Sequence, residues 1–204
     1  TGTGQRIIQQ GSSSIKRYSM ELGGNAPALV FADADLDLAA FLITLLKFSN
    51  TGQICVTPNR VLVEQSVFDA FAEKVVAHAQ QVKLGHGRGS GATMGPLITA
   101  AARERIENWV NEAVSQGAII LHGGKRPASL PKGYYYEPTV LKNVTPAMRV
   151  CCDEVFGPVV SLIPFKDEAD ALAQANGFVV VPETCAELAA GEVAQVLLFK
   201  ESAR

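Results

Sequence analysis

A cysteine and a glutamate in this sequence have the chemistry and the setting for covalent acyl transfer. Cys55 ends the segment Gly52-Gln-Ile-Cys55, and Glu21 opens the upstream segment Glu21-Leu-Gly-Gly-Asn-Ala-Pro27. A thiolate is a strong nucleophile, and a carboxylate can take a proton from water. The pair fits a reaction in which the cysteine holds an acyl group and the glutamate activates the water that releases it.

The elements predicted around Cys55 explain how its thiol would be presented. Residues 36–48 have the pattern of a helix, and Asp33 and Asp35 are candidate caps at its start. Apolar residues occur nearly all round this helix, so we expect it to be deeply buried. The Asn-Thr-Gly turn that follows ends the helix and puts Cys55 on a loop held by rigid packing, open to a cleft.

Glu21 is predicted to lie in a strand-like segment at residues 18–22. Gly23 and Gly24 follow it, and a pair of glycines lets the backbone bend sharply. We expect this bend to let the Glu21 carboxylate swing between positions during the reaction.

Strands and helices alternate along the rest of the chain, and Ser66, Thr99 and Asp167 are candidate N-caps. Further strands are expected at residues 28–31, 60–63, 118–121, 134–136, 139–141 and 159–165, and further helices at residues 4–10, 67–82, 99–116 and 168–175. This alternation predicts an α/β fold with a mainly parallel sheet flanked by helices.

Length, charge and cysteine content exclude several classes of protein. The chain has 204 residues, enough for one large domain or one domain and part of another. Its net charge of −2 and the absence of a basic run argue against nucleic acid as a partner.

The longest apolar stretch, residues 38–46, is too short to cross a bilayer, so no membrane partner is expected. The four cysteines, Cys55, Cys151, Cys152 and Cys185, match neither a zinc framework nor a dense disulfide scaffold, which predicts reduced thiols in the cytoplasm or a similar compartment.

Two other features have plain structural explanations. The run Gly85-His-Gly-Arg-Gly89 resembles a phosphate-binding loop, but it follows a helix and lacks the Gly-Lys-Ser/Thr ending, so we expect a mobile loop. No two of His78, His86 and His122 have the spacing of metal ligands, so no metal site is expected.

Five short segments carry a resemblance to a known family. The segments are Glu21-Leu-Gly-Gly-Asn-Ala-Pro27, Gly52-Gln-Ile-Cys55, Met94-Gly-Pro-Leu97, Tyr135-Tyr-Glu-Pro-Thr-Val140 and Glu154-Val-Phe-Gly-Pro158. The first, second and fifth resemble three signatures of the aldehyde dehydrogenase superfamily, in the family's order, and the other two are similar to its catalytic domain. The resemblance covers about residues 1–177.

The resemblance implies oxidation of a small aldehyde to a carboxylic acid, with NAD or NADP as cofactor. Cys55 matches the family's nucleophile, and Glu21 matches its general base. The run from Gly52 to Arg60 is similar to members that oxidise semialdehydes such as succinate semialdehyde.

The resemblance also implies a set of cofactor-binding residues. Glu154 matches a residue that holds the ribose, Phe156 lies near the nicotinamide ring, and Gly23 belongs to the same site. Thr1 begins Thr1-Gly-Thr-Gly4, which is similar to the end of the family's Gly-Ser-Thr-x-x-Gly turn, where the start of a helix meets the cofactor's phosphates.

The family pattern is incomplete at both ends of the chain. The asparagine that helps hold the oxyanion would precede Thr1, and after Asn176 neither the family's Tyr-Gly-Leu strand nor its Phe-Gly-Gly segment occurs. We therefore expect residues 1–22 to be a remnant of the cofactor-binding domain, residues 23–177 the catalytic domain, and residues 178–204 an atypical C-terminal tail. A domain cut open in this way would expose apolar surface, so we expect copies to associate as a homo-oligomer.

The tail has its own predicted elements, namely strands at residues 178–181 and 196–199 and a helix at residues 182–190.

Two alternatives to aldehyde oxidation stay open. The chain can be a non-catalytic fragment, or a packing module that lacks the cofactor site. It can also be a cofactor-free cysteine esterase, because acyl transfer to Cys55 and hydrolysis through Glu21 need no cofactor.

Overall fold

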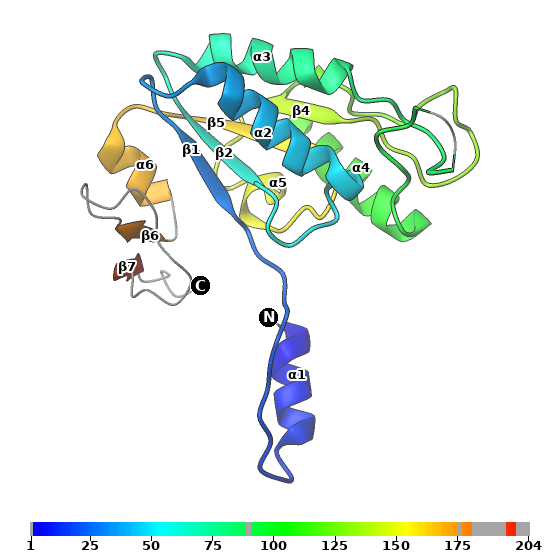
Figure 1. Cartoon of the computed structure of the whole chain (residues 1–204), viewed down its shortest axis with the longest axis vertical. Helices are drawn as coiled ribbons and strands as arrows, with labels where there is room; N and C mark the ends of the chain where they lie inside the picture. Colours follow the sequence, from blue (N-terminus) through cyan, green and yellow to red (C-terminus); the bar gives the residue numbers. More distant parts are fainter. Residues whose placement is uncertain (1, 89–90, 175–176, 181–194, 199–204) are drawn as a thin grey trace.

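A five-stranded sheet forms the centre of the molecule in a computed structural model that describes residues 2–88, 91–174, 177–180 and 195–198 (Figure 1). The strand order is β1-β2-β5-β4-β3; all neighbouring pairs are parallel except β3 with β4. The strands are β1 (Pro27–Val30), β2 (Arg60–Glu64), β3 (Ile119–His122), β4 (Thr139–Lys142) and β5 (Val159–Phe165). The predicted α/β fold with a mainly parallel sheet is confirmed.

Helices cover both faces of this sheet (Figure 1). The helices α2 (Leu36–Phe48) and α3 (Phe68–Gln80) pack on one face, and α4 (Ala100–Ser115) and the short α5 (Arg149–Cys152) pack on the other. Successive residues of β5 alternate between the two cores, because neighbouring side chains of a strand point to opposite faces. Val160 joins the core under α2 and α3, whereas Val159 joins the core under α4. The helix α6 (Glu168–Gln174) contacts β5.

Side-chain caps fix the starts of three helices as predicted. Asp35 Oδ1 accepts from the N–H of Leu38 at 3.0 Å, and Thr99 Oγ1 accepts from the N–H of Ala102 at 3.1 Å. Asp167 Oδ1 accepts from the N–H of Asp170 at 2.9 Å. Each cap satisfies a donor that the helix itself leaves without a partner.

Two predicted caps are wrong. Asp35 alone is the N-cap of α2, so Asp33 has no capping role. The N-cap residue of α3 is Val67, and it makes no capping bond through its side chain. The Ser66 hydroxyl instead donates to Glu64 Oε1 at 2.7 Å, which removes it from the helix end.

Two predicted strands are also wrong. Residues 18–22 join no ladder, and the hydroxyl of Tyr18 donates to the carbonyl of Ile8 at 3.4 Å. Residues 134–136 also join no ladder, although Tyr136 is part of the core under α4. Their backbone bonds go to loops; the N–H of Leu97, for example, donates to the carbonyl of Tyr134 at 3.0 Å. β-Propensity here reflects side-chain burial rather than strand pairing.

The helix α2 is not buried on all sides, which corrects the sequence prediction. One face packs into the core through Ala40, Ile43 and Phe48. The opposite face is apolar yet exposed, and consists of Leu38, Phe41, Leu42, Leu45 and Leu46. A helix that is apolar on all sides is buried on all sides only where other elements pack against every face. In this structure, only one face of α2 is covered by the core. Within the described ranges, no helix is long and apolar enough to cross a membrane.

The two ends of the chain carry separate elements. The predicted N-terminal helix is present as α1 (Gly2–Gly11). The strands β6 (Gly177–Val180) and β7 (Gln195–Leu198) form a two-stranded antiparallel sheet of their own. Both tail strands are confirmed to within a residue at each end; the helix predicted at residues 182–190 lies outside the described residues.

Candidate active site

Cys55 lies on a turn that follows the end of α2. The short helical turn η1 (Ser49–Gly52) ends that helix, and Asn50, Thr51 and Gly52 have positive φ angles of 48°, 61° and 70°. Positive φ is unfavourable for Thr and accessible to Gly, so the surrounding structure must hold this reversal in place. The reversal leaves the Cys55 side chain exposed, as the sequence predicted.

Two other loops fix the turn that carries Cys55. Gln53 Oε1 accepts from the N–H of Ile98 at 2.9 Å, which ties the turn to the loop before α4. Gly52 lies so close to Gly157 that a Cβ at position 52 would be 2.1 Å from the Gly157 carbonyl oxygen. The loop after α5 therefore presses directly on the turn, three residues before the thiol.

Glu21 is exposed in the extended segment that leads into β1. Gly24 of this segment lies beside the Cys55 turn, since a Cβ on Gly24 would be 3.3 Å from the Cys55 carbonyl oxygen. The next residue, Asn25, donates from Nδ2 to the carbonyl of Cys151 at 2.8 Å. The segment that carries the acid is thus fixed against the Cys55 turn on one side and α5 on the other.

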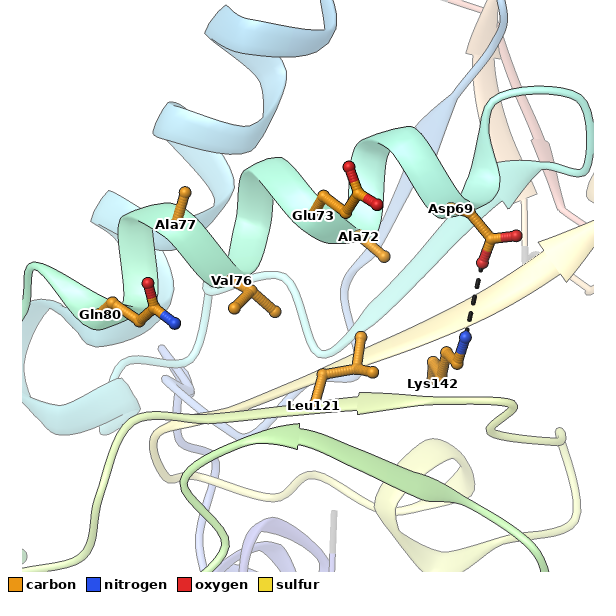
Figure 2. A pocket seen from close by; sticks show the side chains of 8 residues that line it. All are labelled: Asp69, Ala72, Glu73, Val76, Ala77, Gln80, Leu121 and Lys142. Carbon is orange, nitrogen blue, oxygen red and sulfur yellow. Dashed lines mark ion pairs between the residues drawn. The ribbon is translucent and has the colours of Figure 1, made fainter.

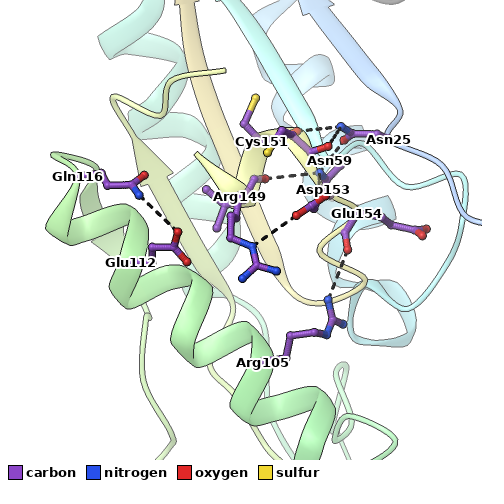
Figure 3. Close-up of polar contacts among 11 residues, drawn as sticks. Asn25, Asn59, Arg105, Glu112, Gln116, Arg149, Cys151, Asp153 and Glu154 are labelled. Carbon is purple, nitrogen blue, oxygen red and sulfur yellow. Dashed lines mark hydrogen bonds and ion pairs between the residues drawn. The ribbon is translucent and has the colours of Figure 1, made fainter. Parts of the chain in front are cut away.

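Asn59 joins these segments through both ends of its side-chain amide. Its Nδ2 donates to Asn25 Oδ1 at 2.7 Å and to the carbonyl of Asp153 at 3.0 Å, as Figure 3 shows. Its Oδ1 accepts from the N–H of Val155 at 3.3 Å and from Lys47 Nζ at 3.4 Å. Asn59 is only 2% exposed. A buried amide with donors and acceptors both satisfied has a fixed orientation, so segments distant in sequence are held in one arrangement.

Glu154 and Phe156, the residues that the resemblance assigns to the cofactor site, lie in the loop after α5. The Glu154 Oε2 atom faces Gly23, where a Cβ would lie 2.1 Å away. Its Oε1 atom is buried and has no hydrogen-bond partner within the part of the chain that the structure describes. A buried acceptor of this kind costs free energy until a donor such as a sugar hydroxyl reaches it. Phe156 has a φ of 47° and is 38% exposed.

Thr1, the remaining residue assigned to the cofactor site, lies outside the described residues.

Lys47 is an unexpected part of this neighbourhood. It lies in the last turn of α2 and is 1% exposed. Burial lowers the pKa of Lys47 to about 8, and the charge of Glu154 acts in the opposite direction and raises that pKa. The pKa of Lys47 is therefore set by its burial in the fold and by the charge of Glu154.

The buried Lys47 predicts a rise in stability between pH 8 and pH 9. Its pKa is about 8 in the folded chain and 10.5 when unperturbed, so above pH 8 the unfolded chain binds the extra proton. Stability then increases with pH, by roughly 1 kcal/mol over this interval. Urea denaturation at a series of pH values should show this rise in the wild type, and the Lys47→Met variant should lack it.

Cys151 limits the interval in which this prediction can be tested. Burial raises the pKa of the Cys151 thiol from 9.0 to about 11, so its contribution to stability is lost as pH rises from 9 toward 11. The difference between the wild type and Lys47→Met at each pH isolates Lys47, because both chains carry Cys151. Identical slopes for the wild type and Lys47→Met in that interval would contradict the assigned protonation behaviour.

Other candidate features lie away from these segments. A pocket of about 570 Å³ lies between α3 and the strands β3 and β4, and its rim carries an ion pair of 3.5 Å between Asp69 and Lys142 (Figure 2). Its lining includes no residue from the Glu21, Cys55 or Glu154 segments. Among the described residues, no group of three or more His, Cys, Asp or Glu side chains is placed to hold a metal ion.

Comparison with known proteins identifies the family. The sequence profile of the aldehyde dehydrogenase family matches residues 1–180. The chain belongs to the aldehyde dehydrogenase family. The resemblance drawn from the short segments is thereby confirmed. A second profile, described as the MoeA C-terminal region (domain IV), matches residues 170–199.

Named relatives within the aldehyde dehydrogenase family include several semialdehyde dehydrogenases. The mitochondrial succinate-semialdehyde dehydrogenase of Oryza sativa subsp. japonica is 44% identical over 176 residues, which are 86% of this chain and 33% of the relative. The glutarate-semialdehyde dehydrogenase of Pseudomonas putida is 43% identical over the same share of this chain and 36% of its own length. The chain spans about a third of the length of these curated relatives.

A solved structure from the family shares the fold. The crystal structure of succinate-semialdehyde dehydrogenase from Burkholderia pseudomallei matches with a TM-score of 0.83 and 42% sequence identity. The match covers 86% of this chain and 36% of that chain.

The sequence assigned no role to Lys47, Asn59 or Asn25, which the structure places among the segments of the candidate site. Lys47 could have been noticed, because a lysine within an apolar helix such as α2 either extends to solvent or is buried with a partner. Asn25 lies within the Glu21–Pro27 segment, but neither its bond to Cys151 nor the bond of Asn59 to Asp153 can be inferred from local sequence, because the partners are distant in the chain.

Proposed function

We propose that this chain carries the acyl-transfer residues for NAD- or NADP-dependent oxidation of an aldehyde to a carboxylic acid, with Cys55 as nucleophile and Glu21 as general base. The observation that supports this most strongly is the contact between Gly24 of the Glu21 segment and the carbonyl of Cys55. It puts the segment of the acid against the turn of an exposed thiol. Membership of the aldehyde dehydrogenase family supports the same chemistry.

The proposed first step uses Cys55. Its thiolate bonds to the aldehyde carbon, and the carbonyl oxygen takes the negative charge of a thiohemiacetal. The backbone N–H of Cys55 has no acceptor among the described residues, so it is free to donate to this oxygen. Removal of one such donor typically costs about 2.7–4 kcal/mol in the barrier.

The proposed second half of the reaction uses Glu21. A bound nicotinamide cofactor supplies the hydride acceptor, which no amino-acid side chain can provide. The acyl group then remains on Cys55 as a thioester. Glu21 takes a proton from water, the water oxygen bonds to the acyl carbon, and the carbon–sulfur bond breaks to give the acid and the Cys55 thiolate, with the proton left on Glu21.

Glu154, Phe156, Gly23 and Thr1 are the residues proposed to hold the cofactor. The unpartnered Oε1 of Glu154 supports a hydroxyl contact there, and the exposed Phe156 supports a ring contact. The names of the relatives support a semialdehyde as the substrate class.

We also propose the domain limits expected from the sequence, with residues 1–22 from the cofactor-binding domain, residues 23–177 as the catalytic domain and residues 178–204 as a tail of a different kind. The family profile that ends at residue 180 and the second profile at residues 170–199 support a change near residue 177. The exposed apolar face of α2 supports association of copies, and the exposed thiols of Cys55 and Cys152 support a reducing compartment such as the cytoplasm.

Acylation of Cys55 tests the proposed function. An activated ester mixed with this chain should give a burst of product and an acyl adduct on the peptide that contains Cys55. The Cys55→Ser variant should lose the burst and the adduct. Cys152→Ser is the matched control, because Cys152 is also an exposed free thiol and should be dispensable.

An unchanged burst in Cys55→Ser would refute the assignment of the nucleophile. Parallel assays with a semialdehyde and NAD or NADP separate oxidation from simple hydrolysis. Ester turnover through Cys55 without any oxidation would favour the cofactor-free esterase.

A further inference from the structure

Two buried polar groups, the Lys47 ammonium and one carboxylate oxygen of Glu154, are not explained by the fold. Lys47 is a lysine with 1% exposure, although lysine is almost never fully buried unless it is paired. Glu154 Oε1 is a buried carboxylate oxygen without a hydrogen-bond partner among the described residues. Burial of the Lys47 ammonium and of the unpartnered Glu154 Oε1 atom costs folding free energy. Their retention near each other suggests a role for the pair.

Asn59 holds the backbone on both sides of Glu154. Its Nδ2 donates to the carbonyl of Asp153, the residue before, and its Oδ1 accepts from the N–H of Val155, the residue after. The peptide groups that flank Glu154 are therefore fixed by one side chain. Figure 3 shows Asn59 against this segment, with Asn25 on its other side.

Lys47 fixes the direction of the same Asn59 amide. Its Nζ donates to Asn59 Oδ1 at 3.4 Å, so the oxygen end of the amide must face Lys47 and the nitrogen end must face Asn25 and Asp153. The ammonium and the Glu154 carboxylate also attract each other through the low-dielectric interior. Lys47 thus acts on Glu154 twice, once through Asn59 and once through charge.

We propose that Lys47 and Asn59 form a clamp that positions the Glu154 carboxylate, so that its free oxygen is held ready for a ligand that donates hydrogen bonds. Both are positioning residues, since they act through Glu154. The identity of that ligand as the cofactor ribose rests on the proposed function. The clamp itself does not, because it can be measured without turnover.

Other charged groups near Glu154 have to be separated from Lys47. Arg105 Nη1 donates to the backbone carbonyl of Glu154 at 3.5 Å, and Asp153 Oδ2 pairs with Arg149 Nε at 3.5 Å. Neither contact involves the Glu154 carboxylate. Asp153 is therefore a suitable control, because it offers the same charge one residue away and pairs with a different cation.

The first experiment titrates the Lys47 ammonium by NMR in the whole chain, with the signal assigned by its absence from Lys47→Arg. Glu154→Gln removes the carboxylate charge and should lower the pKa of Lys47 from about 8 by about one unit or more. Asp153→Asn should leave it nearly unchanged. Equal effects of the two variants, or no effect of Glu154→Gln, would overturn the clamp.

The second experiment measures hydrogen exchange at the N–H of Val155, which Asn59 accepts. Asn59→Ser and Lys47→Met should each speed its exchange about tenfold or more relative to the N–H of Ala39, and Lys47→Arg should restore protection. Unchanged exchange in Lys47→Met would overturn the part assigned to Lys47. If Lys47→Met does not fold, the titration in Glu154→Gln still decides the proposal. Loss of Cys55 activity changes neither readout, so failure of the proposed function is distinguishable.

Discussion

Replacement of Gly52 by alanine should lower the free energy of unfolding by at least about 3 kcal/mol. A Cβ at position 52 would lie 2.1 Å from the carbonyl oxygen and 2.4 Å from the carbonyl carbon of Gly157. It would also lie 2.9 Å from the carbonyl oxygen of Lys47. All three are backbone atoms, which cannot rotate away as a flexible side chain can. The φ of +70° at Gly52 adds strain of its own.

Urea denaturation monitored through Trp109 fluorescence measures this loss. Gly117→Ala is the matched control, because Gly117 has a φ of +107° but no atom within 4 Å of the added Cβ. We expect that control to lose only about 1 kcal/mol from backbone strain. If Gly52→Ala and Gly117→Ala cost the same, the close contact between the Cys55 turn and the Gly157 loop is refuted.

Replacement of Glu21 by glutamine should leave acylation of Cys55 intact and slow release of the acyl group by about 10²–10⁴-fold. Glutamine keeps the size of the side chain but cannot take a proton from water. With an activated ester, the variant should show a full burst followed by almost no turnover. Intact mass spectrometry should then detect the acyl adduct accumulating on Cys55.

Glu112→Gln is the control for this prediction, because Glu112 is a half-buried acid on α4 whose carboxylate accepts from Gln116 Nε2 at 3.4 Å rather than from the Cys55 turn. Its burst and its turnover should match the wild type. Wild-type turnover in Glu21→Gln would show that another group activates the water. Loss of both burst and turnover would show that Glu21 acts before the thioester forms.

Much of this fold could be predicted from the sequence because local patterns and tertiary packing agree. The helix at residues 36–48 was found with its bounds correct, since Asp35 caps it and an Asn-Thr-Gly turn ends it. The β5 strand was found at residues 159–165 because its run of apolar residues is buried on both faces.

The errors arose where the environment of a segment could not be inferred from its composition. Residues 134–136 have strand-like aromatic composition, yet Tyr136 is a core side chain on a loop. The outer face of α2 is apolar but exposed, and nothing in its sequence indicates what lies beside it.

The residues of the candidate site also fall into two groups, those that lie in a local sequence pattern and those whose contacts form only on folding. Cys55 and Glu21 are candidates from the sequence because each lies in a short segment with a recognisable pattern, and the structure puts those segments in contact at Gly24. Lys47 and Asn59 could not be predicted, because their role depends on partners brought together by folding. Asn59 contacts Asp153 and Val155, and no local pattern in the sequence encodes that pairing.

The contacts that fix the Cys55 turn also affect which residues around it can vary among members of the aldehyde dehydrogenase family. Several of its supports are backbone groups: the carbonyls of Cys55 and Gly157 lie against glycines, and the N–H of Ile98 donates to Gln53. Backbone groups are the same whichever side chain a residue carries. Side chains that point outward from the frame, such as Val56 at 72% exposure and Ile98 at 77%, are therefore free to vary. Such positions can change over evolution while the backbone frame around Cys55 stays constant.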